Sequence, residues 1–430
     1  MLRCGAAKRC VTPKLGLNIP QCMSFNPASG VKDDLYTHAI AVESDGKTAI
    51  LISIDTSGLG SSFARRVRNA LKEKIGIDPS AVMVSAIHIH TGGPQLMDVF
   101  WGQGRDLDVE EFFLRETVFA AEEAYNSRVD AVAYFGEGKE DRLSFCRNYI
   151  MNDGTVEMNP SRRQVCNIVK RAGEIDYTLS SLRFDTPDGK HIAEIVNFAC
   201  HPDTVGGSEY SADYPGQMRK RLKEVYGENY TVLFLNGCSG NVNHIDVFRL
   251  ADGTFRYPKD HYVEMGKILA DDVLELHGKM SEISLKVDYA VKRFRAKRRQ
   301  PTEERVKQAE EALARETSSG VTKSLAKEIV KLHRKPKFFE LVEMQVIRIG
   351  DIYVVGFPGE PFADIGLRLR EKVAPKKLII SELANNELGY FATEPAFSGE
   401  VYEAVLPSDP FELDVIDKMI DTAAELIEKI

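Results

Sequence analysis

Hydrophobic positions along the chain fall into short apolar runs and into longer segments in which every fourth residue is apolar. Residues 49–55 are an apolar run of the first kind, which is typical of a buried strand. Residues 61–75 have an apolar residue at every fourth position from Phe63 to Ile75, which predicts a helix with one buried face. Residues 82–89 then predict a second strand, and a right-handed crossover would make it parallel to the first.

The same alternation continues through the chain. It predicts a single domain over residues 1–430 with a mixed, largely parallel β-sheet flanked by helices, which is an α/β fold. The further strands are expected at 193–198, 231–235, 352–357 and 378–383, and the helices at 215–226, 261–277 and 362–372.

Residues 296–340 differ from the rest because Lys, Arg and Glu dominate them, with a Ser-Ser-Gly break at 318–320. This composition favours a solvated helical hairpin inserted into the sheet domain. A lid or a partner-binding element is the alternative interpretation.

A last helix is expected near the C-terminus. Asp409 is suited to cap it, Pro410 to occupy its first position, and Glu412 to complete a capping box. Apolar residues from Ile416 to Ile427 would form its buried face.

Charge and composition exclude some functions. The 430 residues carry a formal net charge of −8, which argues against a nucleic-acid partner. There is no apolar run long enough for a transmembrane segment, and residues 1–8 lack the apolar core of a secretory signal. The seven cysteines are an odd number without a CxxC pair, so we expect reduced thiols and a cytoplasmic protein.

Polar residues with catalytic potential gather at the ends of the expected strands, which is the edge where open α/β sheets bind ligands. His88 and His90 are two apart, so on a strand they would project together and suit a Zn²⁺ site, while hydrogen-bonded core histidines are the alternative. His201 follows the strand at 193–198, and Glu360 follows the one at 352–357. Two or three histidines and a glutamate match a common catalytic zinc set.

Two loops complete this edge. Residues 236–243 contain Ser239 between glycines, but Asn241 stands where the GxSxG nucleophile motif requires its second glycine. The loop at 385–404 contains Tyr390 and Tyr402, residues that more often pack than bind a metal.

Five motifs occur in the order found in the neutral (non-lysosomal) ceramidase family, which the chain resembles over nearly its whole length. They are His88-Ile89-His90-Thr91-Gly92-Gly93-Pro94, Cys200-His201-Pro202, Ser211-Ala212-Asp213-Tyr214-Pro215-Gly216, residues 236–243, and Pro358-Gly359-Glu360. The resemblance implies the catalytic domain of that family, in a short single-domain intracellular relative.

The resemblance also implies residue roles. The zinc ligands would be His88, His201, Glu360 and Tyr390. The residues lining the site would be His90, Arg147, Ser239 and Tyr402. The implied reaction is hydrolysis of an amide by metal-activated water, with a ceramide-like N-acyl compound or a smaller amide as substrate and a role in sphingolipid metabolism.

Some features depart from the family. Thr91-Gly92-Gly93-Pro94 stands where the family has Ser-Gly-Pro, and the chain has no room for the family's C-terminal β-sandwich domain. The substrate therefore stays open, as do the oligomeric state and a second metal near His244 and Asp246.

Three alternatives remain. The first is a zinc esterase or lactonase, and the second is a cysteine hydrolase that uses Cys238 or Cys200. The third is a non-catalytic interaction protein that acts through the charged hairpin.

Overall fold

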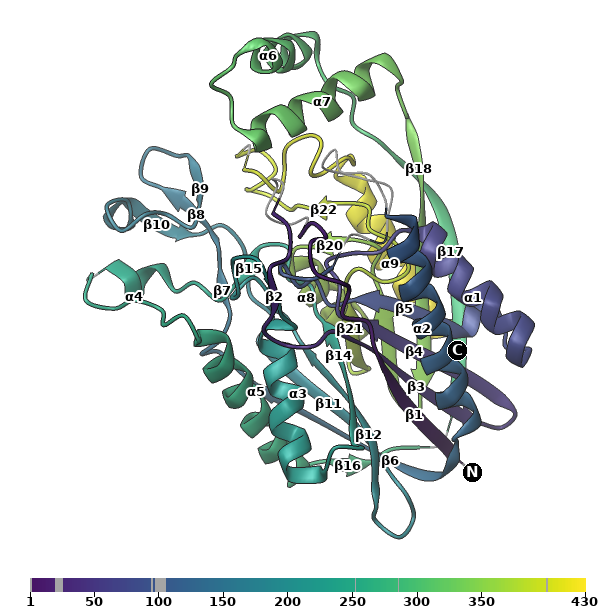
Figure 1. The fold of residues 1–430 in the computed structure, drawn as a ribbon. Helices are drawn as coiled ribbons and strands as arrows, with labels where there is room; N and C mark the ends of the chain where they lie inside the picture. Colours follow the sequence, from purple (N-terminus) through teal and green to yellow (C-terminus); the bar gives the residue numbers. More distant parts are fainter. Residues whose placement is uncertain are drawn as a thin grey trace.

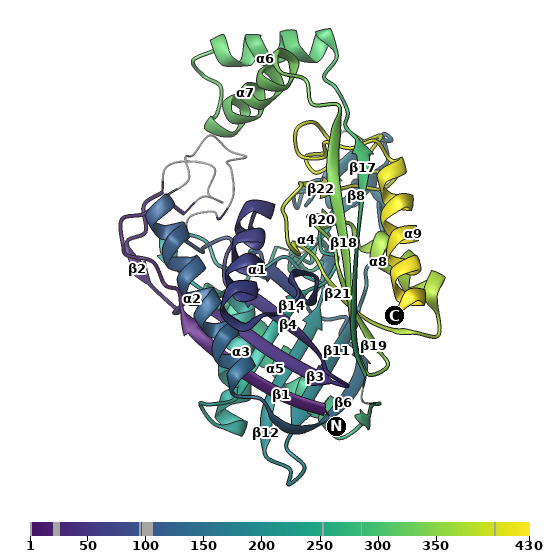
Figure 2. The ribbon, with the colours of Figure 1, turned by 90° about the vertical axis from the view of Figure 1, so that its right-hand side faces the viewer.

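Two β-sheets packed face to face form the centre of the molecule, and helices cover the outer face of each sheet (Figures 1 and 2). The order of layers is therefore helices, large sheet, small sheet, helices. The structure is a computed structural model that describes residues 2–19, 26–93, 96, 106–251, 253–284, 286–399 and 401–430.

The larger sheet has nine strands within these described ranges. Two of its neighbouring pairs, β4 with β5 and β12 with β14, are parallel, and the others are antiparallel. From one edge to the other the order is β14 (Thr231–Asn236), β12 (His191–Phe198), β11 (Thr178–Asp185), β6 (Val129–Lys139), β1 (Leu2–Cys10), β3 (Tyr36–Ser44), β4 (Lys47–Ile54) and β5 (Val82–Ala86), with β16 (Ser281–Glu282) paired to β6.

The smaller sheet also has a parallel pair of strands at one edge. That pair is β19 with β21, and the other pairs of this sheet are antiparallel. The order is β17 (Val287–Lys297), β18 (Phe339–Ile349), β19 (Ile352–Gly356) and β21 (Lys377–Ser381).

Helices cover the two outer faces because each presents an apolar face to a sheet. On the larger sheet lie α1 (Ser61–Ile75), α2 (Leu107–Asn126), α3 (Asp213–Tyr226) and α5 (His261–His277). On the smaller sheet lie α8 (Ala363–Val373) and α9 (Asp414–Lys429). Shorter elements follow the loops: β2 (Gly30–Val31), β7 (Phe145–Cys146), β8 (Asn148–Met151), β9 (Val156–Met158), β10 (Ile168–Arg171), β13 (Glu209–Tyr210), β15 (Val242–Asn243), α4 (Val247–Ala251), β20 (Glu360–Pro361) and β22 (Tyr390–Phe391).

A polar seam joins the two sheets at the point where their parallel strands end. The side chain of Asn197 on β12 donates to the carbonyls of Leu235 and Ile380, both at 2.7 Å, and accepts from the Ile380 amide at 3.1 Å. Asn197 is 2% exposed, so these three bonds replace water that cannot reach the backbone there. One side chain thus connects β12, β14 and β21.

A second part of the seam lies at β5. Arg68 of α1 donates to the Val82 carbonyl at 2.9 Å and to the Gln345 side chain on β18 at 2.9 Å. The Asn385 side chain reaches the same Gln345 oxygen at 2.7 Å. This network fixes the helix layer, both sheets and the loop after β21 in one arrangement.

The predicted β-α-β unit at 49–89, the α/β class and the further strands and helices are all confirmed. Antiparallel pairs are more numerous than expected, because β1, β3, β6, β11, β17 and β18 are strands that the apolar runs did not predict, and all their pairings are antiparallel. The parallel pairs are the ones that were recognised, because each is connected through a helix with a clear apolar period.

The charged insertion is a helical hairpin, as expected, between β17 and β18. It consists of α6 (Glu303–Ala314) and α7 (Gly320–Arg334), which pack on each other through a small core of their own. It stands at one end of the molecule, beyond β20 and β22 (Figures 1 and 2).

The expected capping of the last helix was wrong. Helix α9 begins at Asp414 and has no side-chain cap. Asp409 is instead buried and accepts hydrogen bonds from the amides of Ala392 and Phe411, both at 3.0 Å. The carboxylate holds a loop in place, and the chain needs a further turn before the apolar period of α9 begins.

Two other expectations can be compared with the structure. Cys4, Cys10, Cys146, Cys166, Cys200 and Cys238 are all free thiols. Within the described ranges, no helix has both the length and the apolar character needed to cross a membrane.

We predict that Asn197→Ala lowers the free energy of unfolding by about 2–4 kcal/mol, because a buried donor and acceptor on Ile380 lose their partners. Urea unfolding of the two proteins measures this difference. The control is Asn229→Ala at an exposed position, where about 0.5 kcal/mol or less is expected. Equal midpoints for the two variants would contradict a role for Asn197 in joining the sheets.

Candidate metal-binding active site

His88 lies two residues beyond β5 with a backbone conformation that non-glycine residues seldom adopt. The strand ends at Ala86 instead of continuing to Ile89, and the φ of His88 is 72°. The expectation that His88 and His90 project together from a strand was therefore wrong in its geometry. The turn still brings them together, with ring centroids 5.1 Å apart. Such a strained backbone costs about 1–3 kcal/mol and is typical of functional sites.

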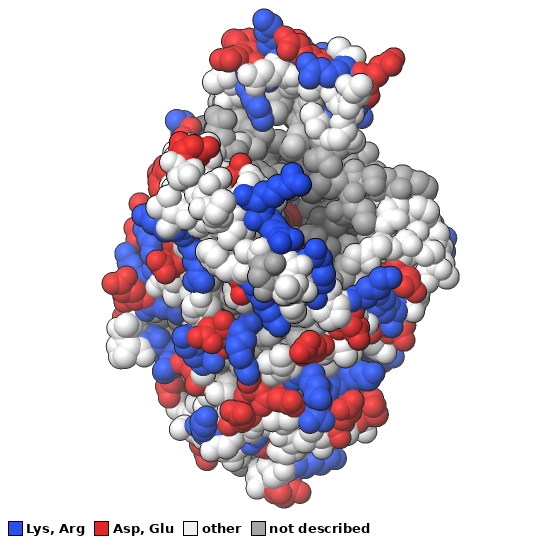
Figure 3. All heavy atoms as spheres, turned by 90° about the vertical axis from the view of Figure 1, so that its left-hand side faces the viewer, with Lys and Arg blue, Asp and Glu red and all other residues white. Residues whose placement is uncertain are grey.

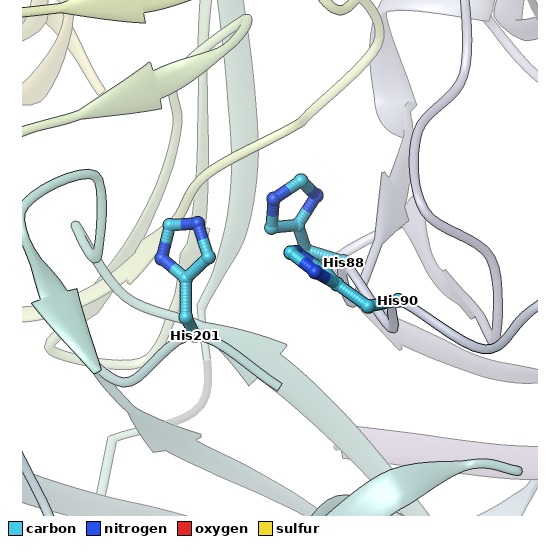
Figure 4. A group of neighbouring side chains, drawn as sticks. All are labelled: His88, His90 and His201. Atoms are coloured by element: carbon cyan, nitrogen blue, oxygen red, sulfur yellow. The ribbon is translucent and has the colours of Figure 1, made fainter. Parts of the chain in front are cut away.

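His201 approaches from the other half of the larger sheet, at the end of β12. Its ring centroid lies 4.8 Å from that of His88. His88, His90 and His201 form a group whose ligand atoms all lie within 4.8 Å of one another, which could hold a metal ion. Figure 4 shows the three rings converging from two separate segments of the chain.

Backbone carbonyls fix the orientation of two of these rings. Nδ1 of His88 lies 2.6 Å from the carbonyl of Ser57, and Nδ1 of His201 lies 2.8 Å from the carbonyl of Ser239. A carbonyl only accepts, so both Nδ1 atoms carry the proton and both Nε2 atoms point toward the site. Metal-binding histidines are usually held by such a bond on their outer nitrogen.

Glu360 lies between the two inward-facing nitrogens. Its Oε2 atom is 3.0 Å from Nε2 of His88 and 3.2 Å from Nε2 of His201. Ligand atoms around a tetrahedral zinc ion are separated by about 3.3 Å, so these spacings fit a shared metal.

The electrostatics of this group favour a cation between the three side chains. Burial lowers the pKa of His201, so this ring is neutral and presents the lone pair of Nε2 to a carboxylate oxygen. Burial opposes ionisation of Glu360, but the charge of His88 holds the pKa of Glu360 well below its usual range. Two buried lone pairs at 3.2 Å repel each other unless a positive ion lies between them.

His90 differs from the other two histidines. Its Nε2 atom is buried and makes no hydrogen bond to the described residues. Burial, together with the charge of His88, lowers the pKa of His90 to about 3, so the ring is neutral at physiological pH. A neutral imidazole with an open nitrogen can accept a proton.

Tyr390 is placed beside Glu360 by the short parallel pairing of β20 with β22. Its hydroxyl lies 3.5 Å from Nε2 of His201 and 3.4 Å from a guanidinium nitrogen of Arg147. Arg147 also binds Glu403 at 2.7 Å and the carbonyl of Gly240 at 2.7 Å. The structure therefore places Arg147 as a support for the Tyr390 hydroxyl.

Tyr402 packs edge-on against Tyr390, with ring centroids 5.9 Å apart. It belongs to the same small apolar cluster as Phe362 and Val401. The structure thus brings Tyr390 and Tyr402, both from the loop at 385–404, into contact with each other.

Ser239 is fully buried beneath the site. Its hydroxyl donates to Glu382 at 2.7 Å, and its carbonyl is the acceptor for His201. The loop lies close to β20: a Cβ atom at Gly240 would come within 2.5 Å of the Glu360 carbonyl. The position of Ser239 suits the orientation of His201 more than contact with a substrate.

Sequence analysis missed Glu382, which holds this loop. The carboxylate is 0% exposed and accepts from the Asn236 amide at 2.8 Å and from the Ser239 backbone at 2.9 Å, in addition to the hydroxyl. Burial raises the pKa of Glu382 to about 8. An acidic residue directly after an apolar strand was the available signal, and it was not used.

Two further carboxylates were also missed, Glu403 beneath Arg147 and Glu387 in the loop before Tyr390. Both have one oxygen atom that is buried without a hydrogen-bond partner among the described residues. Neither has a spacing in the sequence that separates it from ordinary surface glutamates.

The alternative with a cysteine nucleophile is disfavoured. Burial raises the pKa of both Cys200 and Cys238 well above the usual range, so neither is a ready thiolate. The region of His244 contains an ion pair with Asp203 at 3.0 Å, and the described residues offer no second group of three metal ligands there. Pro94, part of the first family motif, lies outside the described residues.

Comparisons with known proteins place the fold. The structure resembles the crystal structure of neutral ceramidase from Pseudomonas aeruginosa, with a TM-score of 0.76 and 16% sequence identity over 100% of this chain and 75% of that one. It also resembles a structure described as ceramidase complexed with C2, with a TM-score of 0.74 and 16% identity over 99% of this chain and 74% of that one. The fold is therefore that of the neutral ceramidase structures.

The match at the level of amino-acid sequence covers a much smaller part of the chain than the match of the fold. A neutral ceramidase of Mycobacterium tuberculosis (strain ATCC 25618 / H37Rv) is 34% identical over 97 residues, which are 21% of this chain and 15% of that protein. No protein-family model matches the chain.

We predict that Glu382→Gln destabilises the protein by about 1–3 kcal/mol. The side-chain NH₂ group of glutamine would face one of the three groups that donate to Glu382, and that hydrogen bond would be lost. Urea unfolding measures the loss, and NMR signals of the His201 imidazole report whether the ring keeps its orientation. Glu371→Gln on the exposed surface of α8 is the control and should change neither quantity. Unchanged stability and an unchanged His201 signal in Glu382→Gln would contradict the role given to Glu382.

Proposed function

We propose that this chain is a zinc-dependent hydrolase that cleaves a linear amide bond in an N-acyl compound. The observation that carries the proposal is the arrangement of His88 and His201 around one oxygen of Glu360. Each imidazole has its outer nitrogen bound to a carbonyl and its inner nitrogen at 3.0–3.2 Å from that oxygen. His₂Glu is a recurrent catalytic zinc set, and the hydroxyl of Tyr390, 3.5 Å from Nε2 of His201, would supply a fourth ligand.

The bound zinc ion would lower the pKa of its water toward about 7 and polarise the scissile carbonyl. The protein residues would supply the remaining chemistry. His90, neutral and with an open nitrogen, would take a proton from the attacking water and give it to the nitrogen of the departing amine. The C–N bond breaks, and the products are a carboxylate and an amine. Arg147 would hold the Tyr390 hydroxyl in position throughout.

The substrate class is proposed from two kinds of support. The fold is shared with proteins described as ceramidases, whose name denotes an N-acyl lipid substrate. The apolar cluster that includes Tyr390, Tyr402 and Val401 lies next to the polar group, and we propose that an acyl chain binds beside it. An ester with the same acyl group could be attacked by the same residues, and parallel assays of matched amides and esters separate the two reactions.

We predict that protein purified without added metal contains about one zinc ion per chain, and that His88→Ala and Glu360→Ala lose it. Elemental analysis gives the stoichiometry, and melting curves with and without a chelator give a readout that is independent of activity. Removal of zinc should lower the melting temperature of the wild type, because Glu360 loses its positive partner. His333→Ala on exposed α7 is the matched control and should keep the metal. A metal-free wild type of normal stability would refute the proposal.

We also predict that His90→Gln lowers kcat about 10²–10⁴-fold on an N-acyl amide while the zinc content stays at the wild-type level. Loss of zinc in this variant would instead assign His90 to the ligand set. Cys238→Ser should keep most of the activity, since a buried thiol takes no part in this chemistry. Inactivation of Cys238→Ser with normal folding would favour the cysteine mechanism.

A further inference from the structure

The basic side of α7 is a feature that the proposed function does not use. Between Gly320 and Leu341 the sequence contains six Lys and Arg residues and two Glu residues. The partner helix α6 has the opposite character, with four Glu and two basic residues. The positive charge of the hairpin is therefore concentrated on one of its two helices and on the segment that follows it.

These cations form a stripe because they recur at helical spacing. Residues Ala326, Ile329 and Val330 are buried against α6 and define the inner side of α7. Positions four and seven apart lie on one side of a helix, so Lys327, Lys331 and Arg334 share another side, where all three are exposed. Among the described residues, Lys327 and Arg334 have no ion-pair partner; Lys331 pairs with Glu328.

Exposed apolar side chains follow the stripe directly. Phe338 is 56% exposed, Phe339 47% and Leu341 53%. Phe339 and Leu341 lie on the same side of β18, since residues two apart in a strand share a face. Their cross-strand partners on β17 are Lys297 and Arg295, both exposed. Cations and large apolar groups therefore alternate on one outer surface.

We propose that the surface formed by residues 323–341 and by Arg295 and Lys297 of β17 docks on an anionic lipid surface. The Lys and Arg side chains would lie at the phosphate level, and the two phenylalanines and Leu341 would enter the boundary of the acyl chains. Charge complementarity identifies the partner as anionic. The three exposed apolar side chains favour a lipid partner, because acyl chains lie directly beneath the phosphates of a leaflet and can accept them.

The location of the hairpin gives the docking a consequence for the site. The hairpin stands at the end of the molecule that carries β20, β22 and the tyrosine loops (Figures 1 and 2). At its base, Arg299 donates to the carbonyl of Ala404 at 2.6 Å and to that of Asp409 at 3.2 Å. Figure 3 shows Lys and Arg interspersed with Asp and Glu both on the hairpin at the top and over the lower part of that face. Docking would turn this end of the molecule toward the membrane.

The test measures binding to vesicles without substrate, so its result does not depend on amide hydrolysis. The full chain is sedimented with vesicles of phosphatidylcholine alone and with vesicles of equal parts phosphatidylcholine and phosphatidylserine. Each Lys or Arg near an anionic leaflet strengthens binding about fivefold. The variant Lys327→Gln/Arg334→Gln should therefore bind the anionic vesicles roughly 25-fold more weakly. The matched control Arg305→Gln/Lys307→Gln removes two exposed cations from α6 and should bind as the wild type does.

A second variant tests the apolar part. Phe338→Ser/Phe339→Ser should weaken binding while the wild-type dependence on salt is retained, because the cations remain. Equal losses in the α6 and α7 variants would overturn the proposal, since net charge alone would then explain binding. The proposal would also be overturned, in favour of an acidic protein partner, if the wild-type protein did not bind anionic vesicles but was retained by immobilised polyglutamate. Circular dichroism confirms that each variant is folded.

Discussion

The two sheets meet at edge strands whose backbone hydrogen bonding is incomplete, and the rest of the structure depends on how the free backbone groups are satisfied. Each of β5, β14 and β21 is the last strand at an edge of its sheet, and buried amides and carbonyls of these strands are bound by side chains. Asn197 binds the backbone of Leu235 and Ile380, and Asn385 binds that of Val84. A polar seam inside an apolar core has few alternative arrangements, because each misplaced group leaves a buried donor or acceptor unpaired. Precise placement of the histidines and of Glu360 follows from this restriction.

The same seam explains why two buried carboxyl groups of the site, Glu360 and Glu382, have pKa shifts in opposite directions. The charge of His88 favours the ionised form of Glu360, whereas Glu382 lies beside the negative charge of Glu360 and among neutral donors that do not offset its burial. The pKa of the first is therefore lowered and that of the second is raised to about 8. One carboxylate is suited to a cation, and the other holds the loop that orients His201. Their separation into two roles comes from the environment, since the side chains are chemically identical.

Local patterns sufficed to predict the elements whose apolar period is strong. The strands before His201 and Glu360 and the helix at 261–277 were located within about two residues. The candidate site residues were proposed because most of them follow such a strand, and the family resemblance implied Arg147 and the tyrosines. What sequence could not give was the turn at His88, since its positive φ depends on bonds to distant Ile54 and Thr56. Glu382 follows an apolar strand, as Glu360 does, but its structural role depends on Asn236 and Ser239, which are far from it in the chain.

The hairpin of α6 and α7 occupies the connection between two strands that pair along their whole length, from Val287 with Ile349 to Lys297 with Phe339. It has its own core, so the sheet register does not rely on it. A connection of this kind is a place where relatives with the same fold can gain, lose or exchange a structural unit during evolution while the catalytic geometry is inherited unchanged. The surface that the molecule presents to its surroundings can therefore diversify independently of its chemistry.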